Sequence, residues 1–146
     1  MKTKSLVFVT IIILFVAPIL LADDYKKEIP VEEAMKAYCA TWLVETGLIQ
    51  HKLVNNNDGT WGLYYKNAET PNYSGTFKIE KAWKGGEGNT WLIVRLSYPL
   101  GPWSINKISE DGNVRERINR SIGDNLPAEI DPKDGSYAKF ILKKKE

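Results

Sequence analysis

Residues 90–98 have the sequence TWLIVRLSY, in which apolar side chains fall on both sides of an extended chain. Successive side chains of a strand point to opposite faces. One face carries three aliphatic side chains: Leu92, Val94 and Leu96. The other face carries two apolar side chains and one arginine: Trp91, Ile93 and Arg95. A strand that is apolar on both faces needs cover on both sides. We therefore expect a central strand with a helix over one face and a loop, a ligand or a second subunit over the other.

Turn residues divide the rest of the chain into further extended stretches. The segments 55–59 and 85–89 are rich in Asn and Gly, which adopt the positive φ of tight turns at low cost. The strands expected between such turns are 48–54, 61–66, 73–84, 90–98, 103–108 and 137–143. Within 73–84, alternation places three apolar side chains on one face: Phe77, Ile79 and Trp83. Residues 114–122 fit either a short helix or an edge strand.

A helical period precedes these strands, in residues 30–46. Apolar or weakly polar residues recur there at spacings of three and four: Val31, Ala34, Met35, Tyr38, Trp42 and Thr46. Pro30 suits a first helical turn, and Gly47 suits a helix stop. A leading helix followed by antiparallel strands predicts an α+β domain, with one N-terminal helix packed on a curved antiparallel sheet. This element order, over residues 30–108, resembles that of the cystatin-like and NTF2-like folds, which implies a helix lying across the sheet.

The amino terminus has the layout of a signal peptide, assigned to residues 1–22. Lys2 and Lys4 precede an uncharged run, residues 6–21, that is only 16 residues long and therefore short for a bilayer span. We expect cleavage after Ala22, and an uncleaved segment would be a membrane anchor. Either outcome exports the remainder, to the periplasm or as a secreted protein.

The residues after this leader form one domain in our interpretation. The charged segment 23–29 is expected to be a flexible tether, and residues 30–146 are expected to be a single domain. The chain has 20 basic and 18 acidic residues, and loss of Lys2 and Lys4 leaves 18 of each. A neutral domain has no field that attracts nucleic acid, so no nucleic-acid partner is expected.

Five residues form the candidate ligand or partner face. They are the outward alternates of the central strand and two nearby tryptophans: Trp61, Trp91, Ile93, Arg95 and Trp103. An apolar sheet face with polar edges is typical of a surface that binds a protein partner, a second copy or a small ligand. The function predicted first is therefore an exported, non-enzymatic binding module without a cofactor.

The alternative is a small hydrolase-like enzyme that uses carboxylates such as Glu80 or Asp111 in an aromatic cleft. The chain has one histidine, His51, expected to be exposed, and one cysteine, Cys39, expected to be a buried apolar residue. A zinc site with several histidines is therefore excluded, and no metal site is predicted. One local basic cluster contains three arginines: Arg115, Arg117 and Arg120.

Overall fold

The computed structural model describes residues 26–44, 51–97, 103–121 and 123–143, so the predicted leader lies outside the described residues. These ranges contain one helix, α1 (Val31–Tyr38), and nine strands. The strands are β1 (Lys27–Glu28), β2 (Thr41–Val44), β3 (His51–Asn55), β4 (Thr60–Tyr65), β5 (Tyr73–Lys84), β6 (Thr90–Leu96), β7 (Trp103–Ile108), β8 (Val114–Arg120) and β9 (Ala138–Leu142).

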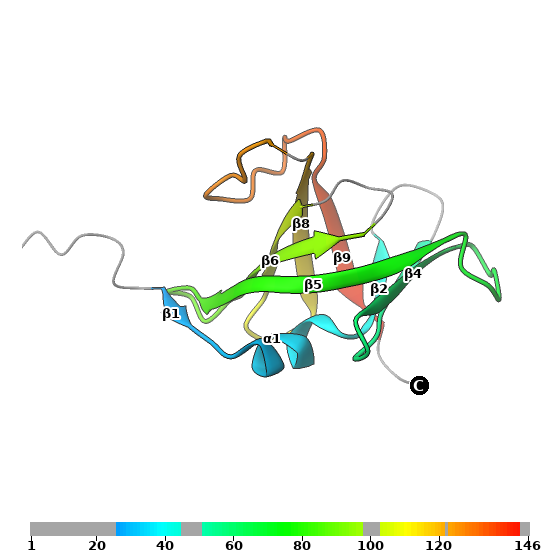
Figure 1. Cartoon of the computed structure of the whole chain (residues 1–146), viewed down its shortest axis with the longest axis horizontal. Coiled ribbons are helices and arrows are strands. Elements are labelled where there is room, and N and C mark those ends of the chain that lie inside the picture. The colour runs from blue at the N-terminus through cyan, green and yellow to red at the C-terminus, as the bar shows by residue number, and fades with distance from the viewer. Residues whose placement is uncertain (1–25, 45–50, 98–102, 122, 144–146) are drawn as a thin grey trace, which may run out of the picture.

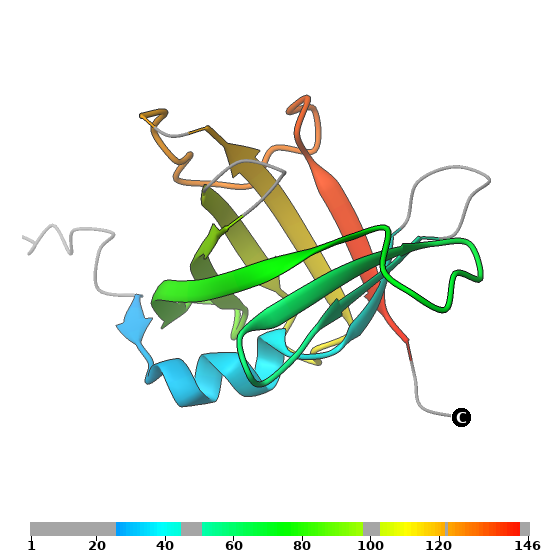
Figure 2. The same cartoon turned by 45° about the vertical axis from the view of Figure 1, so that its right-hand side comes forward.

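Strands β2–β9 form a closed antiparallel barrel of eight strands (Figures 1 and 2). The neighbours follow the order β5, β4, β3, β2, β9, β8, β7 and β6, and β6 pairs back onto β5. The long strand β5 makes this closure possible because its first residues pair with β4, from Tyr73 to Thr76, and its later residues pair with β6, from Phe77 to Lys84. Within the expected tether, Lys27–Glu28 pairs with the end of β5 as β1.

The predicted α+β class is therefore wrong, and the cystatin-like or NTF2-like arrangement is overturned with it. The error begins at the helix, which ends at Tyr38 instead of residue 46. The next residues, Thr41–Val44, form β2, which pairs with β3 on one side and β9 on the other. Aromatic and β-branched residues favour strands, and the two ladders satisfy the backbone of β2 while Trp42 enters the interior with 0% exposure.

Helix α1 lies across one end of the barrel and contacts β5 and β6 (Figure 2). Its buried residues are Ala34 and Tyr38, whereas Val31, expected in the apolar stripe, is exposed. Glu32 and Glu33 occupy the first turn, where the helix dipole favours negative charge. The short helix thus closes the barrel end and does not lie over a sheet face.

A β-bulge in β5 changes which residues face inward. The register with β6 shifts between Ile79 and Lys81, so the alternation of the strand restarts after Glu80. Ile79 pairs with Val94 before the bulge, and Trp83 pairs with Trp91 after it. The prediction that Trp83 shares a face with Ile79 is wrong, because the extra residue directs Trp83 to the outside.

The apolar residues form an inner and an outer cluster. The inner cluster fills the barrel and includes Trp42, Leu92, Val94 and Phe140, all at most 1% exposed. The outer cluster contains Trp83, Ile105 and Ile118, against which pack side chains from β6 and from the loop after β8: Trp91, Ile93, Leu126, Ile130 and Tyr137. The second cover expected for the central strand is thus supplied in part by the chain itself.

Segment 114–122, which fitted two structures, is strand β8 as far as Arg120, and β8 lies between β7 and β9. The helix is therefore wrong, and the strand alternative is correct except that β8 is not at an edge. The paired strands on both sides also explain how two of its arginines are placed inside the barrel. The loop after β8 contains a plain turn at 131–135, where the Lys133 N–H donates to Asp131 Oδ1.

Candidate ligand-binding cavity

A cavity of about 140 Å³ occupies the interior of the barrel, between α1 and the ends of β3 and β4. Its lining is mostly aliphatic and aromatic, with three polar or charged side chains, His51, Asn55 and Arg117. The lining residues are Tyr38, Val44, His51, Leu53, Asn55, Trp61, Leu63, Tyr65, Leu96, Arg117 and Phe140.

Strand alternation explains how neighbouring strands build this cavity. On β3 the inward residues are His51, Leu53 and Asn55, and on β4 they are Trp61, Leu63 and Tyr65. Asn55 pairs with Trp61 and His51 pairs with Tyr65, so the two series run side by side from α1 outward. The cavity reaches the surface beside Tyr65, which is 38% exposed and lies against His51, with ring centroids 4.5 Å apart and planes tilted by 48°.

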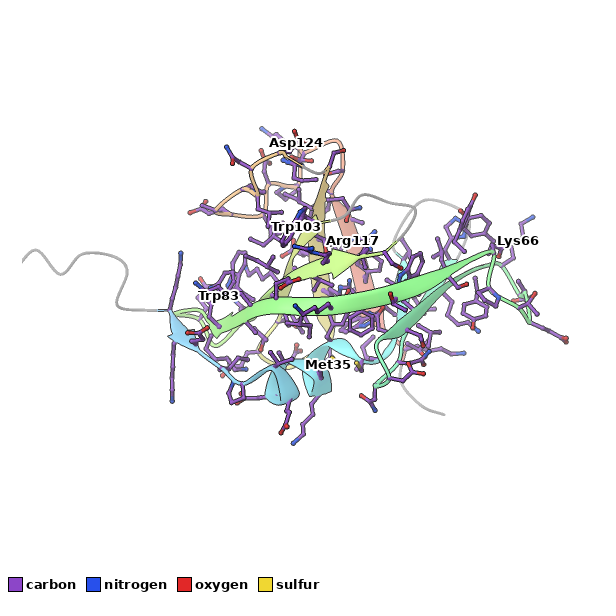
Figure 3. The ribbon with its side chains drawn as sticks, in the orientation of Figure 1. Met35, Lys66, Trp83, Trp103, Arg117 and Asp124 are labelled. Atoms are coloured by element: carbon purple, nitrogen blue, oxygen red, sulfur yellow. The ribbon has the colours of Figure 1, made fainter. Side chains whose placement is uncertain are left out.

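Two arginines of β8 point into the barrel (Figure 3 labels Arg117). Arg115 is fully buried next to α1, where its Nε donates to Asn106 Oδ1 and its Nη2 donates to the Tyr38 hydroxyl, both at 2.9 Å. Its guanidinium carbon lies 4.2 Å from the Tyr38 ring centroid. Arg115 therefore connects the helix to the barrel wall.

Arg117 lies two residues further along β8, at the cavity. It is 9% exposed, and its guanidinium carbon lies 4.8 Å from the Phe140 ring centroid. Its buried Nε has no hydrogen-bond partner among the described residues. Burial, together with the nearby charge of Arg115, lowers the pKa of Arg117 to about 10, so the side chain is still protonated at neutral pH.

Two other cavity side chains have a buried nitrogen without a partner in the described part of the chain: His51 at Nδ1 and Trp61 at Nε1. The indole N–H is a donor, and the imidazole nitrogen is a donor in one tautomer and when the ring is charged. Buried polar atoms in native proteins are normally hydrogen-bonded, and each exception calls for an explanation. The cavity therefore contains unused hydrogen-bonding capacity at three of its side chains.

The structure separates the five residues predicted as one face. Trp61 is inside the barrel and lines the cavity, whereas Trp91, Ile93, Arg95 and Trp103 are outside, on β6 and β7. Trp91 stacks on Trp83, with centroids 6.0 Å apart and planes at 8°. Ile93 lines an outer hollow of about 320 Å³ beside Leu126, and the Arg95 guanidinium lies 4.3 Å from the Trp103 ring centroid.

The carboxylates considered for catalysis lie away from the barrel cavity. Glu80, at the bulge, forms ion pairs with Lys78 at 3.1 Å and with Arg95 at 3.2 Å. Asp111 is in the exposed turn between β7 and β8, and hydrogen bonds from Ser109 and Asn113 lower its pKa to about 2. A general acid needs a raised pKa, so Asp111 is unsuited to that role at neutral pH.

Of the eleven lining residues, the predicted face contained Trp61 alone, and the missed residues include Arg117 and His51. His51, expected to be exposed, is half-buried and lines the cavity. The sequence feature that could have indicated an inward Arg117 is the alternation on β8, where Arg115, Arg117 and Asn119 occupy one face and Ile118 the other. The sequence analysis recorded these arginines only as a local basic cluster, and arginine is seldom buried without a partner.

Cys39 has its thiol close to the Asn56 carbonyl oxygen, at 3.3 Å, and burial raises the pKa of this thiol to about 11. Within the ranges that the structure describes, no three His, Cys, Asp or Glu side chains gather as metal ligands would. No helix in those ranges has the length and apolarity needed to cross a bilayer. Comparison with protein-family models, with curated proteins and with solved structures gives no match.

Proposed function

We propose that this protein is a binding protein that holds a small, mostly apolar molecule inside its β-barrel. The observation that carries the proposal is the cavity of about 140 Å³, lined by side chains from α1 and six strands and reaching the surface beside Tyr65. The two alternatives are binding at the outer aromatic face and catalysis by carboxylates.

The size and lining of the cavity support a small ligand. Protein interiors are close-packed, and voids larger than one water molecule are few in a domain of this size. An apolar cavity of about 150 Å³ is large enough for benzene. The interior space here is similar, and it combines aliphatic and aromatic walls with a few polar groups, as ligand sites usually do.

The outer aromatic residues support binding less well than the interior does. Trp83, Ile105 and Ile118 are already buried under Leu126 and Ile130. The more open aromatic rings have cationic neighbours from the same chain: Lys107 Nζ lies 5.7 Å from the Trp91 ring centroid, and Arg95 covers Trp103. Much of the outer aromatic face is therefore covered by side chains of the same chain.

The proposal can be tested by NMR on ¹⁵N-labelled protein titrated with benzyl alcohol, a neutral molecule with one aromatic ring. We expect saturable shifts in amides of the inner positions of β3 and β4. The variant Leu63→Trp places an indole in the cavity and should abolish these shifts. The matched control Leu43→Trp adds the same group to the outer face of β2 and should leave them unchanged.

Two results would overturn the proposal. One is a titration in which the inner amides do not respond although the protein is folded. The other is a set of shifts confined to the outer positions of β6 and β7, which would favour the outer aromatic face instead.

A further inference from the structure

The cavity contains a buried positive charge without a negative partner in the described part of the chain. Arg117 is protonated at neutral pH and forms no ion pair with any described residue, and no carboxylate is among the lining side chains. The one other guanidinium at this depth is Arg115, which adds a second positive charge and no compensation. Removing a charge from water is costly unless another group offsets it.

The two arginines are not equivalent as ligand anchors. Arg115 donates hydrogen bonds to Asn106 and to the Tyr38 hydroxyl and lies near three rings. Its Nη1 has no described partner, but Arg115 is not among the residues that line the cavity. Arg117 does line the cavity, it stacks against one ring, Phe140, and its Nε has no described partner. A ligand entering the barrel would therefore meet Arg117.

The remaining polar groups of the cavity suit the same kind of ligand. The unpartnered nitrogens of Arg117, His51 and Trp61 can each donate a hydrogen bond, so a molecule rich in acceptors complements them. Guanidinium groups bind carboxylates with particularly strong, directional hydrogen bonds. The aliphatic and aromatic walls, and a volume of about 140 Å³, require the rest of that molecule to be apolar and about as large as one ring.

We propose that the ligand is a small monocarboxylate with an apolar body of about one ring, and that Arg117 binds its carboxylate. This inference rests on the proposed function, since it assumes that the cavity is a binding site. The carboxylate lies at Arg117, and the apolar body contacts Leu53, Leu63 and Leu96. The carboxylate supplies the negative partner that the described residues do not give Arg117.

Benzoate and benzyl alcohol form a matched pair for the test, because they have the same ring and differ in charge. Benzoate is ionised at pH 7, since carboxyl groups of this kind have a pKa of about 4. By calorimetry we expect benzoate to bind the wild-type protein at least about tenfold more tightly than benzyl alcohol. Arg117→Met should remove this preference, and Arg117→Lys should retain part of it.

The control variant Arg95→Met removes an arginine from the outside of β6 and should leave the preference intact. The Arg117 Nε–H resonance of the wild-type protein gives a second measurement, which does not depend on whether the variants fold. This resonance should shift further with benzoate than with benzyl alcohol.

The failure of this inference can be told apart from failure of the proposed function. Equal affinity for the two molecules, or a preference that persists in Arg117→Met, would overturn the carboxylate inference while leaving a binding cavity. Binding of neither molecule would overturn both.

Discussion

Arg115 and Arg117 face the same barrel interior from positions two residues apart, yet they have different surroundings. Arg115 has described partners at Nε and Nη2 and lies near the rings of Tyr38, Trp42 and Phe140. Arg117 stacks on Phe140 alone among the described rings. Arg115 Nη1 has no described partner either, but Arg115 does not line the cavity, whereas Arg117 does and its side chain has no described hydrogen bond. We assign Arg115 to the structure and Arg117 to the site on this basis.

The role of Arg115 leads to a prediction about stability. Arg115→Ala should lower the free energy of unfolding by about 3 kcal/mol, because it empties space and leaves the Tyr38 hydroxyl and Asn106 Oδ1 without their donor. The measurement is urea unfolding followed by tryptophan fluorescence. The control, Arg95→Ala on the outside, should change the value by less than about 0.5 kcal/mol. A similar small effect for Arg115→Ala would contradict the structural role.

At the scale of the element, β5 shows how one inserted residue changes the use of a whole strand. Before the bulge, Phe77 and Ile79 face the interior, and after it Ala82 is the inner residue and Trp83 the outer one. Without the bulge, the larger side chain would point into the space that Ala82 occupies at 2% exposure. The bulge thus places a small residue inside and allows Trp83 to stack on Trp91.

Deletion of Ala82 tests this division of β5 into an inner and an outer face. The deletion should destabilise the protein by at least about 3 kcal/mol, because Trp83 then takes the inner position or, if the bulge is lost, Lys81 does. The matched substitution Glu80→Ala keeps the extra residue and removes only the two partly exposed ion pairs, so its cost should stay below about 1 kcal/mol. Thermal unfolding of the two variants would show the difference. Equal costs would mean that the register of β5 does not determine the stability of the barrel.

At the scale of the whole molecule, the barrel is packed from inside and, on one side, from outside. The loop that joins β8 to β9 places Leu126 and Ile130 against Ile105 and Ile118 (Figure 1, in orange above β8). Polar contacts anchor the end of this loop, where Arg120 forms an ion pair with Asp134 and the Ser136 hydroxyl donates to the Asn119 carbonyl. The loop therefore shields a second apolar cluster without contributing to the cavity.

This arrangement predicts that the loop can be released without damage to the cavity. The double variant Leu126→Ala and Ile130→Ala should accelerate tryptic cleavage after the exposed Lys133 by about tenfold, because each truncation removes apolar contact that holds the loop. Mass spectrometry of timed digests measures the rate, and Glu129→Ala, an exposed position in the same loop, is the control. Benzyl alcohol binding should be unchanged. An unaltered cleavage rate would show that the polar contacts alone hold the loop.

The local sequence alone determined most of the strands and the turns between them. The ranges of β5 and β7 agree with those predicted, and the glycine-containing segments 55–59 and 85–89 form turns as expected. The division of β6 into an inner face, with Leu92, and an outer face, with Ile93, also follows from alternation. These features depend on residues close together in the chain, where side-chain spacing and backbone preferences act directly.

The tertiary structure alone decided the closure of the barrel and the position of the site. Closure depends on pairing between β5 and β6 over the whole second part of β5, and between β2 and β9 from opposite ends of the domain. Alternation predicts a strand but does not specify its partners. Trp42 was predicted to be helical, but it lies in a strand because β2 pairs with β3 and β9. The inward position of Arg117 also depends on the tertiary structure. Arginine normally remains in contact with water, and Arg117 is buried because β8 pairs with strands on both sides in a closed barrel.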